Sequence, residues 1–323
     1  MSAEPSPAGA RIEVERDGRV EVWRIDYPPH NFMNREMVGE LGSLVRAVEG
    51  NPDVGAVVIT GAKSGLFVTH YDIAEILTGI EGVGLEVSPA AADASLRTVG
   101  GLARLPRARS TLKRTPAVGL IELHEIHDLF SRLGRLDTVV IAAIGGPAGG
   151  GGCELALASD LRYMSDDAER IGLPEMTLGF PPGAGGTQRL ARLIGPGRAL
   201  EMILEGRSLA PEQALDVGLV HRVIPAGRLL DTALETAERM ARRAPGSVAA
   251  LKRAIYEGAS ASLPAGLARE RKLFLSAASR PPAARALRAY LDDLERTGTP
   301  GWSDEAALVG WREGTRIDLV DGD

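Results

Sequence analysis

Residues 138 to 159 pass from one continuous apolar segment, through a glycine-rich turn, into a second apolar segment. The first, Thr138 to Ile144, has the composition of a strand that is buried on both faces. The second, Cys153 to Ser159, is predicted to be the start of a tightly packed helix. Glycines between two buried elements let another backbone or a ligand approach closely. We therefore expect a functional site where this strand meets this helix.

The N-terminal part of the chain carries the pattern of an α/β fold. Residues 11–26 alternate in polarity around Asp17-Gly18, which predicts a hairpin with a two-residue turn. Residues 34–49 have apolar side chains at helical spacing, and residues 56–60 form a continuous apolar run that ends at a glycine. A strand, a helix and a strand in this order predict a crossover unit.

The composition of the segments suggests four parts. Residues 1–10 are rich in Ser, Pro and Ala and are expected to be disordered. Residues 11–225 are expected to form the α/β core, with an insertion at about 78–136. Residues 226–296 are predicted to be a helical C-terminal region, and residues 297–323 an extension.

The insertion has the least regular sequence. The stretch from Thr78 to Arg109 is rich in Gly, Ala and Pro and is predicted to be a loop with a short helix. Between Ala94 and Ile121 lie six basic residues and no acid. This segment is either a solvated surface or a lid whose arginines meet the phosphates of a ligand.

The overall composition excludes several classes of function. The net charge is -6 and aromatic residues make up 4% of the chain, which argues against binding to nucleic acid or to anionic membranes. No apolar run is long enough to span a membrane, and the N-terminus has no signal-peptide pattern, so a cytoplasmic protein is expected. The single cysteine, Cys153, excludes an intramolecular disulfide. His124 and His127 lack the spacing of a HExxH site, so no metal is expected.

The glycines at 149–152 stand where a helix is predicted to begin. The N–H groups at a helix N-terminus can bind a phosphate or stabilise an oxygen that becomes negative during a reaction. The segment lacks the lysine of a phosphate-binding GxxxxGK[ST] loop and the GxGxxG spacing of a dinucleotide site. A role in stabilising an oxyanion fits better.

Two carboxylates lie close to glycine-rich segments. Glu154 follows the glycines directly, inside an apolar helix start, and Glu175 lies in Leu173-Pro174-Glu175. Either one alone is most simply a solvated acid or a helix-start acid. Together they suggest acid–base chemistry, with one carboxyl holding a proton while the other accepts one.

The motifs, taken in order, resemble those of the enoyl-CoA hydratase/isomerase (crotonase) superfamily. The resemblance rests on IAAI at 141–144, GGGGCELA at 149–156, GLPE at 172–175, PGAGGTQRL at 182–190 and APEQALDVGLV at 210–220. Upstream, PPHNFMN at 28–34 and LFVTHYDI at 66–73 occupy the order expected of substrate loops.

This resemblance implies a ClpP/crotonase-like spiral of β-β-α turns with a helical C-terminal region, assembled as a homotrimer or homohexamer. It implies an acyl-CoA thioester as the ligand, with no metal or redox cofactor. It places acid–base roles on Glu154 and Glu175, and an oxyanion hole on the backbone N–H groups of Tyr71 and Gly151. The substrate-binding positions that it implies are Asn31, Phe32, Phe67, His70, Tyr71, Asp72, Ile73, Gly149, Gly150, Gly151, Pro174, Glu175 and Gly179.

Some residues depart from the family pattern. His70 and Tyr71 stand where small residues are usual, and bulky side chains there can narrow the acyl pocket or strain the loop. The stretch between Asp72 and Glu154 is also much longer than the resemblance implies. These departures bear on the substrate more than on the fold.

The presence of both carboxylates favours an enoyl-CoA hydratase. An enoyl-CoA isomerase or a thioester hydrolase on the same scaffold remains an alternative. A non-catalytic acyl-CoA-binding protein is the alternative from another class.

Overall fold

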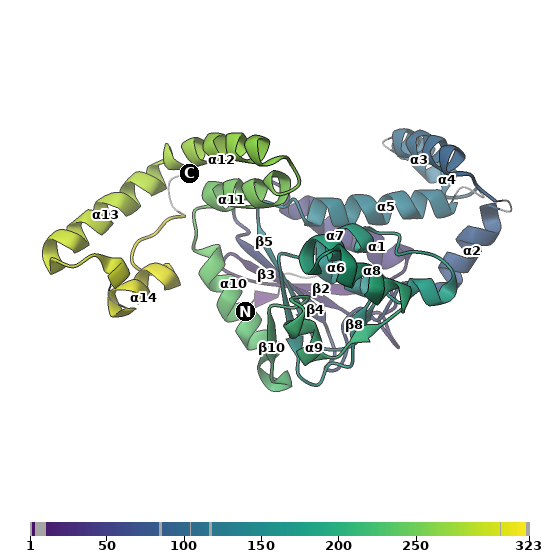
Figure 1. Ribbon diagram of the computed structural model, residues 1–323, viewed down its shortest axis with the longest axis horizontal. Helices are drawn as coiled ribbons and strands as arrows, with labels where there is room; N and C mark the ends of the chain where they lie inside the picture. Colours follow the sequence, from purple (N-terminus) through teal and green to yellow (C-terminus); the bar gives the residue numbers. More distant parts are fainter. Residues whose placement is uncertain are drawn as a thin grey trace.

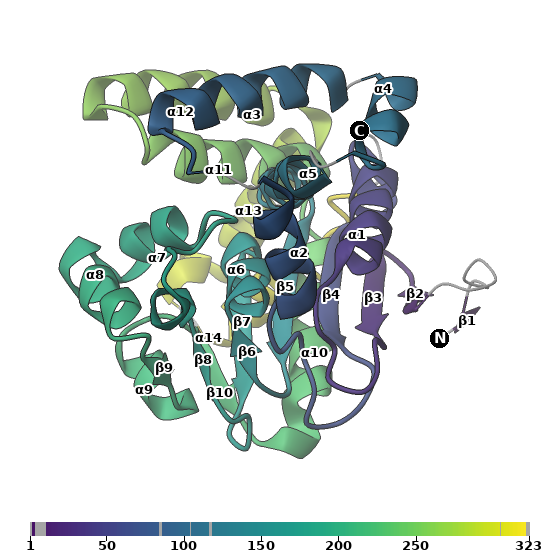
Figure 2. The same cartoon turned by 90° about the vertical axis from the view of Figure 1, so that its right-hand side faces the viewer.

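A computed structural model describes residues 2–3, 11–83, 86–103, 105–115, 118–303 and 305–320. Its centre is a seven-stranded sheet in the order β1-β2-β3-β4-β5-β7-β10 (Figures 1 and 2). The strands of this sheet are β1 (Ser2–Ala3), β2 (Ile12–Asp17), β3 (Val20–Ile25), β4 (Ala56–Gly61), β5 (Val139–Ile144), β7 (Leu161–Ser165) and β10 (Arg222–Ile224). The first three pair antiparallel, and the rest of the sheet is parallel. A small second sheet joins β6 (Ala148–Gly149), β8 (Ile171–Gly172) and β9 (Ser208–Leu209).

The predicted hairpin and crossover are confirmed. β2 and β3 pair around Asp17-Gly18, and β4 then joins β3 in parallel after helix α1 (Arg35–Val48). Asn34 caps α1 by accepting a hydrogen bond from the Met37 N–H at 2.9 Å. The apolar face of α1 is buried against the sheet, so the helical spacing seen in the sequence marks this contact.

The central strands are buried on both faces. In β4, Val57 and Ile59 face one apolar core, and Ala56 and Val58 face the other. The second core is closed by helix α10 (Leu229–Ala241). The prediction of buried strands at 56–60 and 138–144 is therefore confirmed. β7 was not predicted, because Arg162 interrupts its apolar pattern.

The burial of Arg162 has a local explanation. Its guanidinium donates to the carbonyl oxygens of Leu219 and Ser159, each at 2.8 Å. A buried charge that is fully hydrogen-bonded in this way can stay inside the protein.

The prediction of a loop from Thr78 to Arg109 is wrong. The structure has helices α2 (Ile73–Val83), α3 (Pro89–Ala103) and α4 (Pro106–Leu112), followed by α5 (Val118–Leu133). Proline is well tolerated in the first turn of a helix, and alanine is the strongest helix former. The prolines that suggested a loop therefore mark the starts of α3 and α4.

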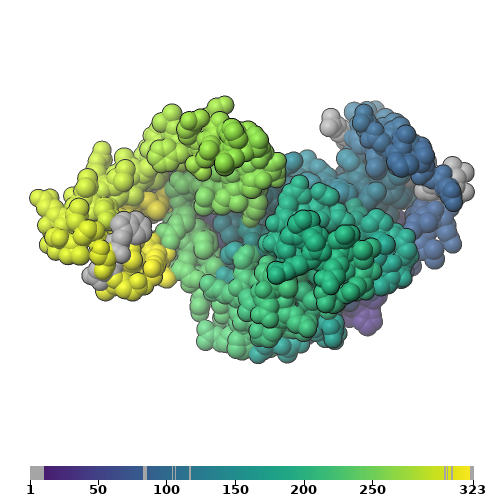
Figure 3. All heavy atoms as spheres, in the orientation of Figure 1, coloured from purple at the N-terminus to yellow at the C-terminus, as the bar shows by residue number. Residues whose placement is uncertain are grey.

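Helices also dominate the C-terminal part, as predicted. Here α11 and α12 lie above the sheet, and α13 and α14 extend away from the core on the side opposite to α2–α4 (Figure 1). A hollow on the surface separates the α11–α12 pair from α3 and α4 (Figure 3). The helices from residue 186 onward are α7 (Gly186–Ile194), α8 (Pro196–Leu204), α9 (Pro211–Asp216), α10, α11 (Pro245–Gly258), α12 (Leu263–Ala278), α13 (Pro281–Thr297) and α14 (Glu305–Glu313).

The expected boundaries of the four parts stay predictions. Most of the expected disordered segment, residues 4–10, lies outside the described residues, as do residues 321–323 of the expected extension. Ser2–Ala3 pairs with β2. The described part of the extension contains α14.

Candidate active site

A mainly apolar cavity of about 370 Å³ lies between α2, α5 and the start of helix α6 (Gly151–Ala158). Both predicted acids and both residues of the predicted oxyanion hole line it. The lining residues are Tyr71, Glu75, Ile76, Gly79, Ile80, Gly119, Leu120, Glu122, Leu123, Ile126, Gly151, Glu154, Glu175, Phe180, Pro181, Gly183 and Ala184. Residues that are far apart in the chain therefore meet at one site.

Glycines allow α6 to begin against another loop. Gly150 precedes α6 with a φ of 48°, a conformation that side chains disfavour. A Cβ atom at Gly152 would clash with the carbonyl oxygen of Val68, because the two backbones nearly touch. This close approach brings the loop that carries Tyr71 to the N-terminus of α6.

The amides of Tyr71 and Gly151 are neighbours. A Cβ atom added at Gly151 would lie 3.5 Å from the Tyr71 nitrogen. Met33 pairs with the backbone on both sides of Tyr71, accepting from the Asp72 N–H and donating to the His70 oxygen. Among the described residues, neither the Tyr71 N–H nor the Gly151 N–H has a hydrogen-bond acceptor. Two unpaired donors at one cavity can bind a carbonyl oxygen.

Glu154 is buried, with 3% of its surface exposed. Its Oε1 accepts hydrogen bonds from the N–H groups of Ala184 and Gly186, both at 2.8 Å. Burial raises the pKa of Glu154, while these two donors and Arg189 act in the opposite direction. The two N–H groups stabilise the ionised form of the carboxyl.

Glu175 begins a short 3₁₀ helix, Glu175–Leu178. Burial raises its pKa to about 7, and the charge of Glu154 adds to this rise. Its Oε2 is buried and has no hydrogen-bond partner among the described residues. Glu175 can therefore hold a proton near neutral pH, where Glu154 has donors that favour ionisation.

Three further polar residues were not predicted from the sequence: Glu75 and Glu122 at the cavity, and Arg35, which pairs with both. The Tyr71 hydroxyl donates to Glu75 at 3.2 Å, and burial raises the pKa of Tyr71. Arg35 forms ion pairs with Glu75 at 3.0 Å and with Glu122 at 3.1 Å. Both glutamates line the cavity, whereas Arg35 is not one of the lining residues. The feature of the sequence that could have identified Glu122 is its charge within the apolar pattern of α5.

Other predicted substrate positions lie around the cavity without lining it. The Asn31 side chain is buried and bonds to Tyr27 N–H and to the carbonyl oxygens of Ile25 and Phe67. Phe67 is fully buried in the core. Both residues hold the loop that carries Tyr71, and their contact with a substrate stays a prediction.

The remaining predicted positions flank the same loop and turn. The rings of Phe32 and His70 stack with centroids 4.3 Å apart. Asp72 accepts from the Ala74 N–H at 2.8 Å and so caps α2, which begins at the exposed Ile73. Gly149 ends β6 and Gly150 is the residue before α6, while Pro174 and Gly179 flank the 3₁₀ helix that Glu175 begins.

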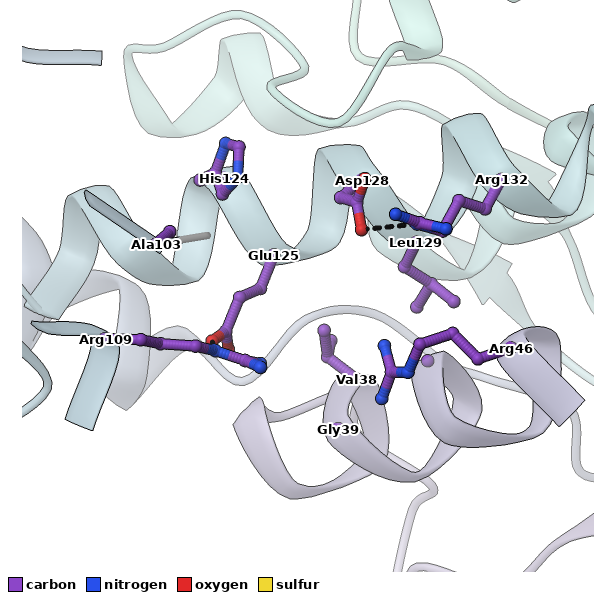
Figure 4. Close-up of a pocket in the computed structure, with 11 residues that line it drawn as sticks. Val38, Gly39, Arg46, Ala103, Arg109, His124, Glu125, Asp128, Leu129 and Arg132 are labelled. Carbon is purple, nitrogen blue, oxygen red and sulfur yellow. Dashed lines mark hydrogen bonds and ion pairs between the residues drawn. The ribbon is translucent and has the colours of Figure 1, made fainter. Parts of the chain in front are cut away.

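A second cavity, of about 440 Å³, lies on the other side of α5, between α5 and α1 (Figure 4). Apart from Arg46, which bonds to Ser43, the Arg, Asp and Glu residues that line it form ion pairs. Glu125 forms ion pairs with Arg109 at 2.6 Å and with Lys113 at 3.0 Å, and Arg132 pairs with Asp128 at 2.7 Å. These basic residues of the insertion therefore meet acids of α5.

Within the described ranges, no group of three or more His, Cys, Asp or Glu side chains is placed to hold a metal ion. None of the helices in that part of the chain is long and apolar enough to cross a membrane.

Comparison with known proteins identifies the family. Residues 116–304 match the model of the enoyl-CoA hydratase/isomerase family. The chain is 33% identical over 290 residues to the short-chain-enoyl-CoA hydratase of Clostridium acetobutylicum, covering 89% of this chain and 97% of the relative. It is 44% identical over 163 residues to the 2,3-dehydroadipyl-CoA hydratase of Escherichia coli, covering 50% of this chain and 64% of the relative.

A solved structure shows the same fold. The enoyl-CoA hydratase from Bacillus anthracis superposes with a TM-score of 0.71 and 29% identity, covering 88% of this chain and 97% of that one. The crotonase-like fold implied by the sequence is thereby confirmed. The chain is a member of the enoyl-CoA hydratase/isomerase family, within the crotonase superfamily.

Proposed function

We propose that this protein is an enoyl-CoA hydratase, which adds water across the double bond of a 2-enoyl-CoA thioester. The observation that carries the proposal is the meeting of two carboxylates and two unpaired backbone N–H groups at one cavity. The similarity to proteins named as enoyl-CoA hydratases supports the same reaction.

In this proposal the thioester oxygen accepts hydrogen bonds from the amides of Tyr71 and Gly151. Attack at Cβ moves electrons toward this oxygen, which becomes negative in the transition state. Fixed donors in a site with little water stabilise such a charge, and each contributes about 3 kcal/mol. Backbone donors also explain how the bulky Tyr71 can stand at this position, since the N–H does not depend on the side chain.

Glu154 and Glu175 move the protons. Ionised Glu154 takes a proton from the attacking water, whose oxygen bonds to Cβ. Protonated Glu175 gives its proton to Cα as the carbon–carbon π bond breaks. Product release and one proton transfer from Glu154 to Glu175 restore the starting state. Glu154 is assigned as the base because two N–H groups favour its ionised form, and Glu175 as the acid because its pKa is raised to about 7.

This reaction needs neither a metal nor a redox cofactor, and coenzyme A enters as part of the substrate. We also propose a homotrimer or homohexamer in the cytoplasm. Exposed apolar side chains on α11, α12 and α13 support an assembly of this kind, since a large apolar surface favours contact between chains. They include Leu251, Leu263, Phe274, Leu275, Leu287 and Leu291.

The test is to incubate the purified protein with crotonyl-CoA and longer 2-enoyl-CoAs. Loss of the absorbance of the conjugated thioester, with formation of 3-hydroxyacyl-CoA, is the expected result. Release of free CoA would instead indicate a hydrolase, and a shifted double bond an isomerase. Binding of every acyl-CoA without turnover would overturn the proposal in favour of a non-catalytic acyl-CoA-binding protein.

A further inference from the structure

The cavity has a polar wall that the proposed reaction does not use. Glu75 of α2 and Glu122 of α5 form this wall, and we call them the acidic wall. The hydroxyl of Tyr71 reaches Glu75 at 3.2 Å, while the backbone of Tyr71 lies beside Gly151. Glu75 is therefore about the length of one tyrosine side chain away from the proposed oxyanion hole, and Arg35 pairs with both Glu75 and Glu122. At this distance Glu75 lies beside the outer part of a short acyl chain, beyond the reacting carbons.

The charges of the acidic wall are incompletely balanced. Arg35 is the one cation that pairs with it among the described residues, and it serves both Glu75 and Glu122. The side chain of Glu122 is only 10% exposed, and its buried Oε1 lies 3.1 Å from Arg35 Nε without the geometry of a hydrogen bond. Burial raises the pKa of Glu122 despite the neighbouring Arg35. The surroundings of Glu122 therefore disfavour a negative charge in this part of the cavity.

Among the residues that the structure describes, none that lines the cavity is Lys, Arg or His. Of the basic residues of the insertion, Arg109 and Lys113 pair with Glu125, and Arg109 and Glu125 line the second cavity (Figure 4). Apart from the four glutamates and Tyr71, the lining is formed by apolar residues and glycines.

We infer that the acidic wall selects uncharged acyl chains and excludes those that end in a carboxylate, with Glu122 as the main specificity-determining residue. This inference rests on the proposed hydratase function. A terminal carboxylate would leave water for an apolar cavity and meet two acids without a free cation. Both the desolvation and the repulsion between like charges oppose its binding. An uncharged chain of the same length meets neither penalty.

A matched pair of substrates tests the inference. Hex-2-enoyl-CoA and 2,3-dehydroadipyl-CoA share a six-carbon chain and the reacting double bond, and differ in the terminal carboxylate. The kcat/KM of the wild-type protein is expected to be at least about 100-fold higher for the uncharged substrate, because desolvation and like-charge repulsion both oppose binding of the terminal carboxylate. Similar values for the two substrates would overturn the inference while leaving the hydratase function intact. Turnover of neither would contradict the proposed function itself.

Variants then locate the selectivity. Glu122→Gln is expected to raise kcat/KM for 2,3-dehydroadipyl-CoA about 10-fold or more, and to leave hex-2-enoyl-CoA within about 3-fold, because it removes a like charge and not a catalytic group. Glu81→Gln removes the same charge from an exposed position of α2 that does not line the cavity, and is expected to change neither value. An unchanged substrate ratio in a folded Glu122→Gln variant would exclude this role for Glu122.

Competitive inhibition of the wild-type protein supplies a readout that does not depend on any variant. Hexanoyl-CoA and adipyl-CoA are saturated, so neither can be hydrated. The inhibition constant of hexanoyl-CoA is expected to be at least about 10-fold lower than that of adipyl-CoA. Equal inhibition constants would show that the cavity accepts a terminal carboxylate.

Discussion

Glu154 and Glu175 line the same cavity in different surroundings. One oxygen of Glu154 accepts two backbone hydrogen bonds, whereas one oxygen of Glu175 is buried without a partner. A carboxylate that accepts N–H groups is stabilised in its charged form, and burial alone favours the neutral form. Burial raises the pKa of both carboxyls, and under the proposed mechanism the two N–H donors make Glu154 the base and leave Glu175 as the acid.

The pH dependence of hydration should reveal the acid. The pKa of Glu175 is raised to about 7, so its proton is present below this pH and lost above it. We expect kcat/KM for crotonyl-CoA to fall by up to about tenfold per pH unit above pH 7. A profile that stays flat up to about pH 9, with the fold intact by circular dichroism, would exclude Glu175 as the proton donor.

Removing either carboxylate should abolish most of the activity. Glu154→Gln and Glu175→Gln keep the shape of the side chain but can no longer exchange the proton, so each is expected to lower kcat about 100- to 10,000-fold. The measurement is the initial rate with crotonyl-CoA, together with the unfolding midpoint. Glu169→Gln, at an exposed position outside the helices and strands, is the matched control and should keep full activity. Normal turnover in either active-site variant would remove that residue from the mechanism.

At the scale of elements, glycines set how closely the walls of the cavity approach. Helices α2 and α5 contact each other at Gly79 and Gly119, both of which line the cavity. A Cβ atom at Gly119 would lie 3.0 Å from the Cα of Gly79 and 3.2 Å from its carbonyl oxygen. Backbone atoms at that distance have to move apart, so a side chain here displaces α2.

Two glycine-to-alanine changes should therefore have opposite effects. Gly119→Ala is expected to lower the free energy of unfolding by about 1–3 kcal/mol, because it overpacks the α2–α5 contact. Gly101→Ala, in α3, meets no atom within 4 Å and should raise it by about 0.5–1 kcal/mol through helix propensity. Urea unfolding measures both. A stabilised Gly119→Ala variant would show that the contact is looser than described.

At the scale of the whole molecule, a buried ion pair connects the C-terminal helices to the sheet. Lys252 of α11 contacts Asp160 at 2.6 Å and donates to the Thr138 carbonyl at 2.7 Å. Asp160 also accepts from the Val140 N–H and from the Tyr256 hydroxyl, each at 2.8 Å. This cluster joins α11 to the start of β5.

Lys252→Met should strongly destabilise the protein, by about 3–5 kcal/mol, because it leaves the Asp160 carboxylate buried without its cation. Arg253→Met is the adjacent control. Arg253 pairs with Asp137 on the surface, with half of its side chain exposed, so the expected loss is below about 1 kcal/mol. Chemical unfolding compares the two. Equal losses would mean that the buried pair does not anchor α11.

Much of the fold follows from local patterns in the sequence. The apolar runs at 56–60 and 138–144 identified strands buried on both faces, and the spacing at 34–49 identified α1. The prediction of a loop between Thr78 and Arg109 is wrong because a proline can begin a helix as well as break one, and Pro89 and Pro106 begin helices here. β7 was not predicted because Arg162 interrupts its apolar pattern, and the hydrogen bonds that allow this arginine to be buried come from residues outside the strand.

The sequence by itself determined the family, through its ordered motifs, and the four residues that the structure brings together at the cavity. Only the tertiary structure decided how Glu154 and Glu175 differ and that Glu122 faces the same cavity. Local periodicity follows from helix and strand geometry, so it can be observed in a sequence. The surroundings of one carboxyl depend on backbone donors and side chains from distant segments, and the packing of the whole chain places them.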